Sequence, residues 1–353
     1  MDYKTIFTTL IDTVIKQRGS DLHLSEGRHP TVRVDGELIP LLNQEVLTSK
    51  DTEGLLLQMI TPDSEIKFKE EQELDFAYQH TDGNRFRGNA FVQQGKFGIV
   101  LRLIPKQIRT MEELNLPPVL ETFARKEQGF FLVVGPVGQG KTTTLASMVE
   151  LINTERASHI VTIENPVEYV YEQKKSIIDQ REVHTDTKDF GTALISAFRQ
   201  DVDVILVGEM RGPKTIAAAV TAAETGHLVM STLHTNNASQ TIDRIIDSFP
   251  SGQQDQIRIQ LASSLTAIFS QRLIPRISGG MIPAYELLIN NNAVANLIRE
   301  RRTHELDTVI ETGSDHGMID MNRYLAELVR KGEITVENAY MHSLQPKILE
   351  KLL

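Results

Sequence analysis

Residues 130–145 carry the feature that most constrains how this chain folds. The run Phe-Phe-Leu-Val-Val over 130–134 has the length and composition of a strand that is buried on both faces. The next eight residues, Gly135 to Thr142, match the pattern G-x-x-x-x-G-K-S/T at every fixed position. Glycines in such a turn allow successive backbone N–H groups to face a polyphosphate, and the helix that follows directs its positive end at the same anion. Strand, loop and helix in this order predict a phosphate-binding loop.

Two side chains of this loop have predicted roles of their own. Lys141 is expected to reach the β- and γ-phosphates of ATP, and the Thr142 hydroxyl is expected to ligate Mg²⁺. The residues predicted to bind the nucleotide are Gly135, Pro136, Val137, Gly138, Gln139, Gly140, Lys141, Thr142 and Thr143.

Composition limits the class of protein. The chain has 353 residues, enough for two domains, and no cysteine, which excludes disulfides, cysteine zinc sites and thiol catalysis. It has no apolar run long enough to span a bilayer, and its polar start does not resemble a signal peptide. A net charge of −10 argues against a surface that binds nucleic acid all over. We expect a soluble cytoplasmic protein with no direct membrane insertion.

Three segments follow from the hydrophobic patterns. Residues 1–104 combine helical patterns with short strands and hairpin turns, which predicts a small α+β domain with an antiparallel sheet. Residues 105–118 contain three prolines without a strong period and predict a linker. Residues 119–353 begin with strands that alternate with helices, which is typical of a doubly wound parallel sheet. From Ala238 on, the pattern predicts helices, apart from one strand at 284–289.

Four polar residues flank predicted strands of this sheet. Glu164 and Glu209 each follow an apolar run, and His227 and His234 bracket the run at 228–232. Because the phosphate loop lies at the carboxyl ends of parallel strands, we expect all four near the nucleotide. Glu209 is the candidate for polarising water or for binding Mg²⁺ through water, and Glu164 is a second candidate for the water-activating role. The histidines lack further ligands for a metal site, so each is expected to hydrogen-bond near the γ-phosphate.

Three arginines lie on predicted strands of the N-terminal domain. Arg85 and Arg87 are two residues apart and so share one face of their strand, and Arg102 lies on the next strand. One interpretation is a solvated basic face. The other is that one or more of them reach the triphosphate bound by a neighbouring subunit.

These motifs together resemble the hexameric ATPases of type II and type IV secretion, and among them the ATPases that retract type IV pili. The resemblance covers nearly the whole chain. It rests on the segments Ser20–Ser25, Arg85–Arg87, the phosphate loop, the acidic segment Thr162–Glu168, the segment Val207–Arg211 and the two histidine segments Thr221–Leu228 and Thr232–Thr235.

The resemblance implies a PAS-like N-terminal domain joined to a RecA-like P-loop ATPase domain of the α/β class. It also implies a homohexamer with Mg·ATP between subunits, in which arginines from a neighbour complete the site. The partners it implies are an inner-membrane pilus platform protein, at the cytoplasmic face of that membrane, and in some systems a second retraction ATPase. Relatives that drive pilus extension usually carry a longer N-terminal region and a tetracysteine motif, and this chain has no cysteine.

Two departures from the family pattern leave an alternative open. Asn165 stands where the family usually has an aspartate, and Ala295 replaces an arginine in the segment Ala293–Glu300, which the resemblance ties to retraction. An accessory pilus ATPase that needs a partner motor is therefore the first alternative. A nucleic-acid motor of the RecA-like kind is the second, and the acidic charge and the lack of basic runs count against it.

Overall fold

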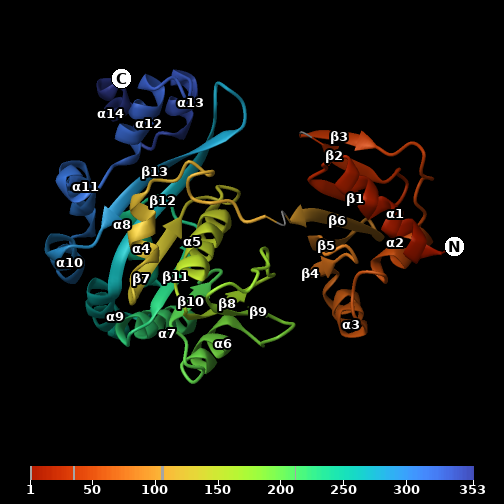
Figure 1. Cartoon of the computed structure of the whole chain (residues 1–353), viewed down its shortest axis with the longest axis horizontal. Coiled ribbons are helices and arrows are strands. Elements are labelled where there is room, and N and C mark those ends of the chain that lie inside the picture. The colour runs from red at the N-terminus through yellow and green to blue at the C-terminus, as the bar shows by residue number, and fades with distance from the viewer. Residues whose placement is uncertain (1, 35, 105–106, 211) are drawn as a thin grey trace. The chain divides into compact units, whose positions relative to one another are not determined.

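The chain folds as two compact units, which we describe one at a time. The computed structural model describes residues 2–34, 36–104, 107–210 and 212–353 (Figure 1). One unit comprises Met1–Gln107 with Pro166–Val170, and the other Ile108–Asn165 with Tyr171–Leu353. The first two residues of the predicted linker and Arg211, the last residue of the segment Val207–Arg211, lie outside the described residues.

The first unit is built on an antiparallel sheet of six strands in the order β3-β2-β1-β6-β5-β4. Its elements are α1 (Tyr3–Lys16), β1 (Asp21–Ser25), β2 (Thr31–Val34), β3 (Glu37–Pro40), α2 (Ser49–Leu56), α3 (Pro62–Glu71), β4 (Glu73–Gln79), β5 (Arg85–Gln93) and β6 (Lys96–Ile104). Helix α1 starts at Asp2, whose side chain accepts a hydrogen bond from the Thr5 backbone N–H. Its apolar residues at helical spacing, such as Leu10 and Val14, are fully buried in this unit's core. The predicted α+β architecture is present.

The second unit contains the phosphate loop. Its elements up to the end of the sheet are α4 (Val119–Ala124), β7 (Gly129–Val134), α5 (Lys141–Glu155), β8 (His159–Glu164), β9 (Ile177–Glu182), α6 (Phe190–Ala197), β10 (Val204–Val207), α7 (Pro213–Glu224), β11 (Leu228–Leu233), α8 (Ala238–Asp247), α9 (Ser251–Ser264), β12 (Leu265–Pro275) and β13 (Met281–Ile289). The C-terminal part contains α10 (Asn292–Arg299), η1 (Thr303–Glu305), α11 (Leu306–Thr312), η2 (Ser314–His316), α12 (Met321–Arg330), α13 (Val336–His342) and α14 (Pro346–Leu352).

Seven strands form the sheet of this unit, in the order β13-β12-β7-β11-β10-β8-β9. All neighbouring pairs are parallel except β12 and β13, which form an antiparallel hairpin. The strand predicted at 284–289 is present as β13, but the mostly helical prediction for the segment after Ala238 is wrong for β12. Helix α9 ends at Ser264 and β12 starts at the next residue, so no glycine or proline marks the change of structure.

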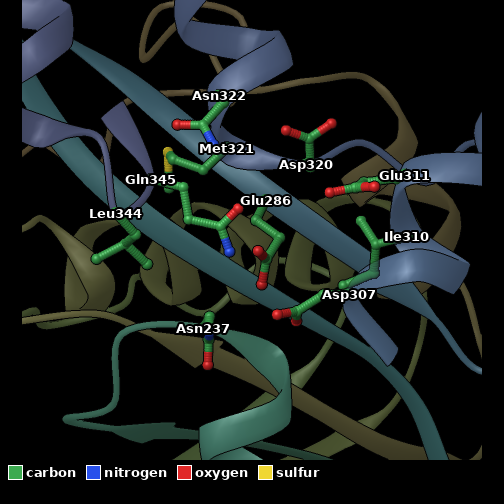
Figure 2. Close-up of a pocket in the computed structure, with 10 residues that line it drawn as sticks. All are labelled: Asn237, Glu286, Asp307, Ile310, Glu311, Asp320, Met321, Asn322, Leu344 and Gln345. Carbon is green, nitrogen blue, oxygen red and sulfur yellow. The ribbon is translucent and has the colours of Figure 1, made fainter. Parts of the chain in front are cut away.

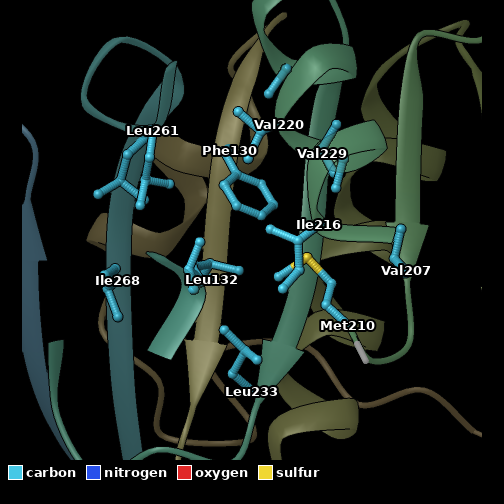
Figure 3. Packing of buried hydrophobic residues seen from close by; sticks show 14 of the residues in the cluster. Phe130, Leu132, Val207, Met210, Ile216, Val220, Val229, Leu233, Leu261 and Ile268 are labelled. Atoms are coloured by element: carbon cyan, nitrogen blue, oxygen red, sulfur yellow. The ribbon is translucent and has the colours of Figure 1, made fainter. Parts of the chain in front are cut away.

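Side chains of β7, an interior strand, pack on both faces of this sheet. Phe130 and Leu132 point to the face that carries Ile216 of α7 and Leu261 of α9 (Figure 3). Phe131 points to the opposite face, where its ring stacks on that of Phe123 of α4 with the centroids 5.2 Å apart. All six residues of β7 are buried, which explains why the run at 130–134 is uniformly apolar.

Part of the predicted linker is packed against the second unit. From Ile108 on, the chain belongs to this unit, and the side chains of Met111 and Leu116 are buried. The prolines and the absence of a period therefore mark an irregular segment that is nonetheless anchored by apolar side chains.

Candidate functional site

The phosphate loop, Gly135–Thr142, joins β7 to α5 at the carboxyl edge of the parallel sheet. Gly138 and Gly140 have φ of 78° and 77°, a region that side chains disfavour. At Gly135, an added Cβ would lie 2.3 Å from the carbonyl oxygen of Gln271, so only glycine fits there. Gly140 caps α5 without a side-chain hydrogen bond. The first N–H groups of α5 are therefore not capped by the Gly140 residue and can serve an anion.

Lys141 is held inside the loop. Its Nζ donates to the carbonyl oxygens of Gly135 and Pro136, at 2.7 Å each, and lies 3.2 Å from Nδ1 of His234. Burial lowers the pKa of Lys141 to about 8, against the opposing effect of Glu209. This buried ammonium group donates to two carbonyl oxygens and lies next to an imidazole nitrogen, and the carboxylate of Glu209 offsets part of the cost of its burial. An incoming phosphate would supply further negative charge.

Lys141, His234 and Glu209 form a line at this edge. A protonated Lys141 can only donate, so Nδ1 of His234 accepts in this contact and a ring hydrogen lies on Nε2. That Nε2 is 3.9 Å from Oε2 of Glu209, the residue two positions after the end of β10. The His234 side chain is half exposed, whereas that of Glu209 is 19% exposed. The structure thus brings together three of the predicted site residues from three different strand ends.

Glu164 occupies the end of β8, next to β10. Its Oε1 accepts hydrogen bonds from the Thr162 hydroxyl at 2.6 Å and from Gln180 at 3.4 Å, and the side chain is buried. A Cβ placed on Gly208 would lie 3.4 Å from the Cα of Glu164, so Glu164 adjoins the residue that precedes Glu209. Both predicted acids therefore lie at the carboxyl edge.

The structure corrects the expectation for His227. This residue precedes β11, whereas His234 follows it, and β11 runs parallel to β7 with Leu228 opposite Gly129 and Leu233 opposite Val134. A strand of six residues is about 20 Å long, so the two histidines lie at opposite edges of the sheet. Within this unit, His227 donates from Nδ1 to the carbonyl oxygen of Ala222 at 3.0 Å and lies beside the ring of Phe198. It does not lie near the phosphate loop of its own chain.

The three predicted arginines belong to the first unit. Arg87 of β5 pairs directly with Arg102 of β6, which in turn pairs with Asp21 of β1. Paired residues on adjacent strands share a face of the sheet, so Arg87 and Arg102 are neighbours, and Arg85, two residues along, lies on the same face. The Arg102 side chain donates from Nε to Oδ1 of Asp21 at 2.8 Å and is nevertheless 67% exposed.

Comparison with known proteins identifies the family. Residues 3–336 match the family model described as type II/IV secretion system protein. The chain belongs to this family. It is 45% identical over 332 residues to the type IV pilus retraction ATPase PilT of Pseudomonas aeruginosa, covering 94% of this chain and 96% of that protein. It is 38% identical to the type IV pilus ATPase PilU of the same organism, covering 96% and 88%.

A solved structure of a type II/IV secretion relative supports the same assignment. The crystal structure of the pilus retraction motor PilT with bound ADP has a TM-score of 0.90 and 43% identity, and the match covers 98% of both chains. The α/β fold class, with an N-terminal domain and a RecA-like ATPase domain, is therefore confirmed, as are the predicted family and the ATPase class. No helix in the described ranges is both long and apolar enough to cross a membrane.

The ligands that the described residues offer for Mg²⁺ are few. Within the described part of the chain, no group of three or more His, Cys, Asp or Glu side chains could hold a metal ion by itself. Mg²⁺ in nucleotide sites is usually held by one or two protein oxygens together with phosphates and water. A single hydroxyl such as that of Thr142, with Glu209 acting through water, fits this mode.

A pocket in the described structure lies away from the phosphate loop, between β13 and the C-terminal helices (Figure 2). Four acids line it: Glu286 of β13, Asp307 and Glu311 of α11, and Asp320 at the start of α12. Glu286 accepts hydrogen bonds at Oε1 from the Ala238 N–H at 2.9 Å and from the Ser270 hydroxyl at 3.2 Å. Burial, and to a smaller extent Asp307 and Asp320, raise the pKa of Glu286 to about 7. We name this the acidic pocket.

No residue of β12 was predicted to belong to the site, although this strand pairs with β7. Gln271 of β12 is buried; one end of its amide group contacts Gln139 of the phosphate loop and the other end contacts Thr144 of α5. A weak signal was present, because Thr266, Ile268, Phe269 and Ile274 are residue types that favour strands, although the run does not alternate between apolar and polar residues.

Proposed function

We propose that this chain is a ring-forming motor that couples the hydrolysis of Mg·ATP to the retraction of a type IV pilus. The observation that carries the proposal is the row of Lys141, His234 and Glu209 beside the phosphate loop. The helix that follows the loop, α5, has no side-chain cap at its N-terminus. Similarity to a pilus retraction ATPase over nearly the full length of both chains supports the coupling to pili.

In this mechanism the phosphate loop and Lys141 bind the polyphosphate of ATP. Thr142 would ligate Mg²⁺, which neutralises charge on the β- and γ-phosphates. Glu209, which lies at the same edge and is mostly buried, accepts a hydrogen bond from the attacking water and orients it. Glu164, which lies next to Gly208, borders the position of this water on the side of β8. When Lys141 turns to the phosphate, His234 loses the donor to its Nδ1, so its hydrogen bonding reports whether nucleotide is bound.

Charge balance points to a contribution from a second subunit. Phosphoryl transfer needs positive charge near the γ-phosphate beyond one lysine, and the predicted arginines belong to the first unit. In the proposed homohexamer, Arg85, Arg87 or Arg102 of one subunit completes the site of the next. The exposure of Arg102 despite its bond to Asp21 leaves its side chain accessible for such a role.

The proposed domain limits are residues 1–104 for the N-terminal domain, 105–118 for the linker and 119–353 for the ATPase domain.

The proposed cellular setting follows from the same relatives. The ring acts in the cytoplasm on an inner-membrane platform protein of the pilus machine. It works alone or with a second retraction ATPase.

A chromosomal deletion tests the proposal directly. Loss of a retraction motor leaves cells with abundant pili that do not retract, and complementation with the intact gene restores retraction. Bald cells after deletion would instead identify an extension motor and contradict the proposal. Purified protein is expected to hydrolyse ATP, with activity unchanged by single-stranded DNA. Stimulation by DNA that falls with salt would favour a nucleic-acid motor.

An accessory pilus ATPase is the second candidate, favoured by two positions. Asn165 is exposed beside Glu164 and lacks the charge that an aspartate would supply. Ala295 is buried in the core on α10, so the helix is formed but offers no arginine at that position. If pili still retract after the deletion, and retraction fails only when a second motor is weakened, the accessory role is correct.

A further inference from the structure

Strand β12 contacts the back of the phosphate loop through Gln271. This side chain is 2% exposed, although glutamine is a residue that proteins rarely bury. Its Nε2 donates to the carbonyl oxygen of Gln139 at 2.7 Å, and its Oε1 accepts from the Thr144 hydroxyl at 2.6 Å. Gln271 therefore connects the middle of the loop to the first turn of α5.

The chemistry of the partners fixes the orientation of this amide. A backbone carbonyl can only accept, so the nitrogen of the Gln271 amide must face Gln139. The oxygen then faces Thr144, whose hydroxyl can donate to it. Both ends of the Gln271 amide are thus hydrogen-bonded, as a buried amide requires.

A second contact runs in the opposite direction. The Gln139 side chain accepts at Oε1 from the backbone N–H of Leu273, at 2.6 Å, two residues beyond Gln271. The main chain of Gly135 also passes so close to Gln271 that no Cβ fits between them. The loop is thereby attached to β12 through both the backbone and the side chain of Gln139.

The bond to the Gln139 carbonyl has a consequence for phosphate binding. In a planar trans peptide, the carbonyl oxygen and the N–H of the next residue point in opposite directions. Because the oxygen of Gln139 points at β12, the N–H of Gly140 points away from β12. The φ of 77° at Gly140 belongs to this arrangement.

We propose that Gln271 is a positioning residue for nucleotide binding, which holds the peptide between Gln139 and Gly140 so that the Gly140 N–H faces the phosphates. Thr144 supports Gln271 from α5, because its hydroxyl occupies the other end of the same amide. The inference rests on the assignment of the phosphate loop as the nucleotide site. Since the β-phosphate is bound in ground and transition states alike, Gln271 contributes uniform binding, which affects KM more than kcat.

The test compares Gln271→Met with the wild-type full chain. Methionine keeps the length of the side chain and removes both hydrogen bonds. The dissociation constant of a fluorescent ADP analogue and the KM for ATP are expected to rise about tenfold, while kcat changes less than threefold. Binding of ADP by the wild type tests whether the phosphate loop is the nucleotide site. The ratio of the dissociation constants of variant and wild type tests the role of Gln271.

Two further substitutions separate positioning from general packing. Thr144→Val removes the hydroxyl and is expected to raise the dissociation constant in the same direction, and Thr144→Ser, which keeps the hydroxyl, is expected to restore it. Ser270→Ala is the matched control, because Ser270 is equally buried but points to the other face of β12, where it donates to Glu286. It is expected to leave ADP affinity within twofold.

Unchanged ADP affinity in both Gln271→Met and Thr144→Val would overturn the inference, even if both lowered the melting temperature. Equal loss of affinity in Ser270→Ala would also overturn it, because any buried hydrogen bond of β12 would then have the same effect. If Gln271→Met does not fold, the Thr144 pair decides the question alone.

Discussion

Two buried charged groups of the second unit, Lys141 and Glu286, respond to the same physics in opposite directions. Burial disfavours the charged form of any group, so it lowers the pKa of Lys141 to about 8 and raises that of Glu286 to about 7. Glu286 lies on β13, and Lys141 is the first residue of α5, in the loop that follows β7 of the same sheet. By their shifted pKa values alone, each would qualify as a candidate functional residue.

The surroundings of the two groups differ. Lys141 donates to carbonyl oxygens of a loop whose uncapped helix start favours an anion, so a phosphate completes its environment. Glu286 accepts from the start of α8 and faces other acids in the acidic pocket, so it is neutralised by a proton instead. A shifted pKa therefore identifies a binding site only when the neighbours leave room for a charge of opposite sign.

The largest expected effect comes from removing the charge of Lys141, with removal of the Glu286 carboxyl as the comparison. Lys141→Ala is expected to lower ATP hydrolysis by roughly three orders of magnitude, because the lysine is the loop's only contact of full positive charge with the phosphates. Glu286→Gln keeps the hydrogen-bond acceptor for Ala238 and is expected to leave hydrolysis at pH 7 within threefold. Steady-state ATPase assays on both variants provide the measurement. A comparable loss in Glu286→Gln would show that the acidic pocket takes part in turnover.

A second substitution separates binding from turnover at the phosphate loop. Glu209→Gln removes the carboxylate that would orient water and keeps the size of the side chain, so kcat is expected to fall about 100-fold or more. ADP affinity is expected to change less than threefold, because the proposed role of Glu209 is to orient the attacking water rather than to hold the phosphates. Calorimetric titration with ADP, beside the ATPase assay, distinguishes the two. Turnover near wild type would remove Glu209 from the mechanism.

The phosphate loop was predictable from sequence, and the acidic pocket was not. Strand, loop and helix from Phe130 to Leu145 are contiguous, so local pattern suffices for them. Glu209 and Glu164 were also placed correctly, because the rule on strand ends needs only the order of strands. Glu286 and Asp307 are brought together by packing of the C-terminal helices on β13, which no local pattern encodes.

Two errors have related causes. His227 was grouped with His234 because both flank the same apolar run, although the direction of the strand places only the residue after it at the carboxyl edge. Gln271 was overlooked because β12 follows α9 without a break, so the strand that contacts the phosphate loop was not expected. In both cases sequence proximity was a poor substitute for the register of strands within a sheet.

The acidic pocket is expected to make stability depend on pH. The folded pKa of Glu286, about 7, lies above its ordinary value of 4.5, so the folded chain binds more protons than the unfolded chain between these values. The contribution of Glu286 to the free energy of unfolding is then fully present below about pH 4.5 and is lost as pH rises through about 7. Between pH 5.5 and 8 this single group contributes a loss on the order of 2 kcal/mol in the free energy of unfolding.

Urea unfolding of the ligand-free full chain at several pH values measures this loss, with Glu286→Gln as the control. The glutamine cannot ionise, so the difference between wild type and variant is expected to grow from pH 5.5 to 8 in favour of the variant. The other groups facing Glu286 are the carboxylates of Asp307, Glu311 and Asp320 and, on β12, the guanidinium of Arg272. These groups are present in both proteins, so their contributions to the difference in the free energy of unfolding cancel to first order. Parallel curves for the two proteins would contradict a titrating Glu286.

The smallest expected effect is the pH dependence of nucleotide affinity at the phosphate loop. The pKa of Lys141 in the free protein, about 8, is lowered from 10.5, and a bound phosphate raises it again by supplying negative charge. Binding above about pH 8 therefore takes up a proton, and ADP affinity is expected to fall about tenfold between pH 7 and 9. Titration calorimetry in two buffers of different ionisation enthalpy counts the proton directly. Lys141→Arg is the control, because a guanidinium stays charged throughout this range and should bind ADP without proton uptake. Equal affinity of the wild type at both pH values would mean that Lys141 is charged in the free loop at pH 9, and that Lys141 and Glu286 differ in ionisation as well as in surroundings.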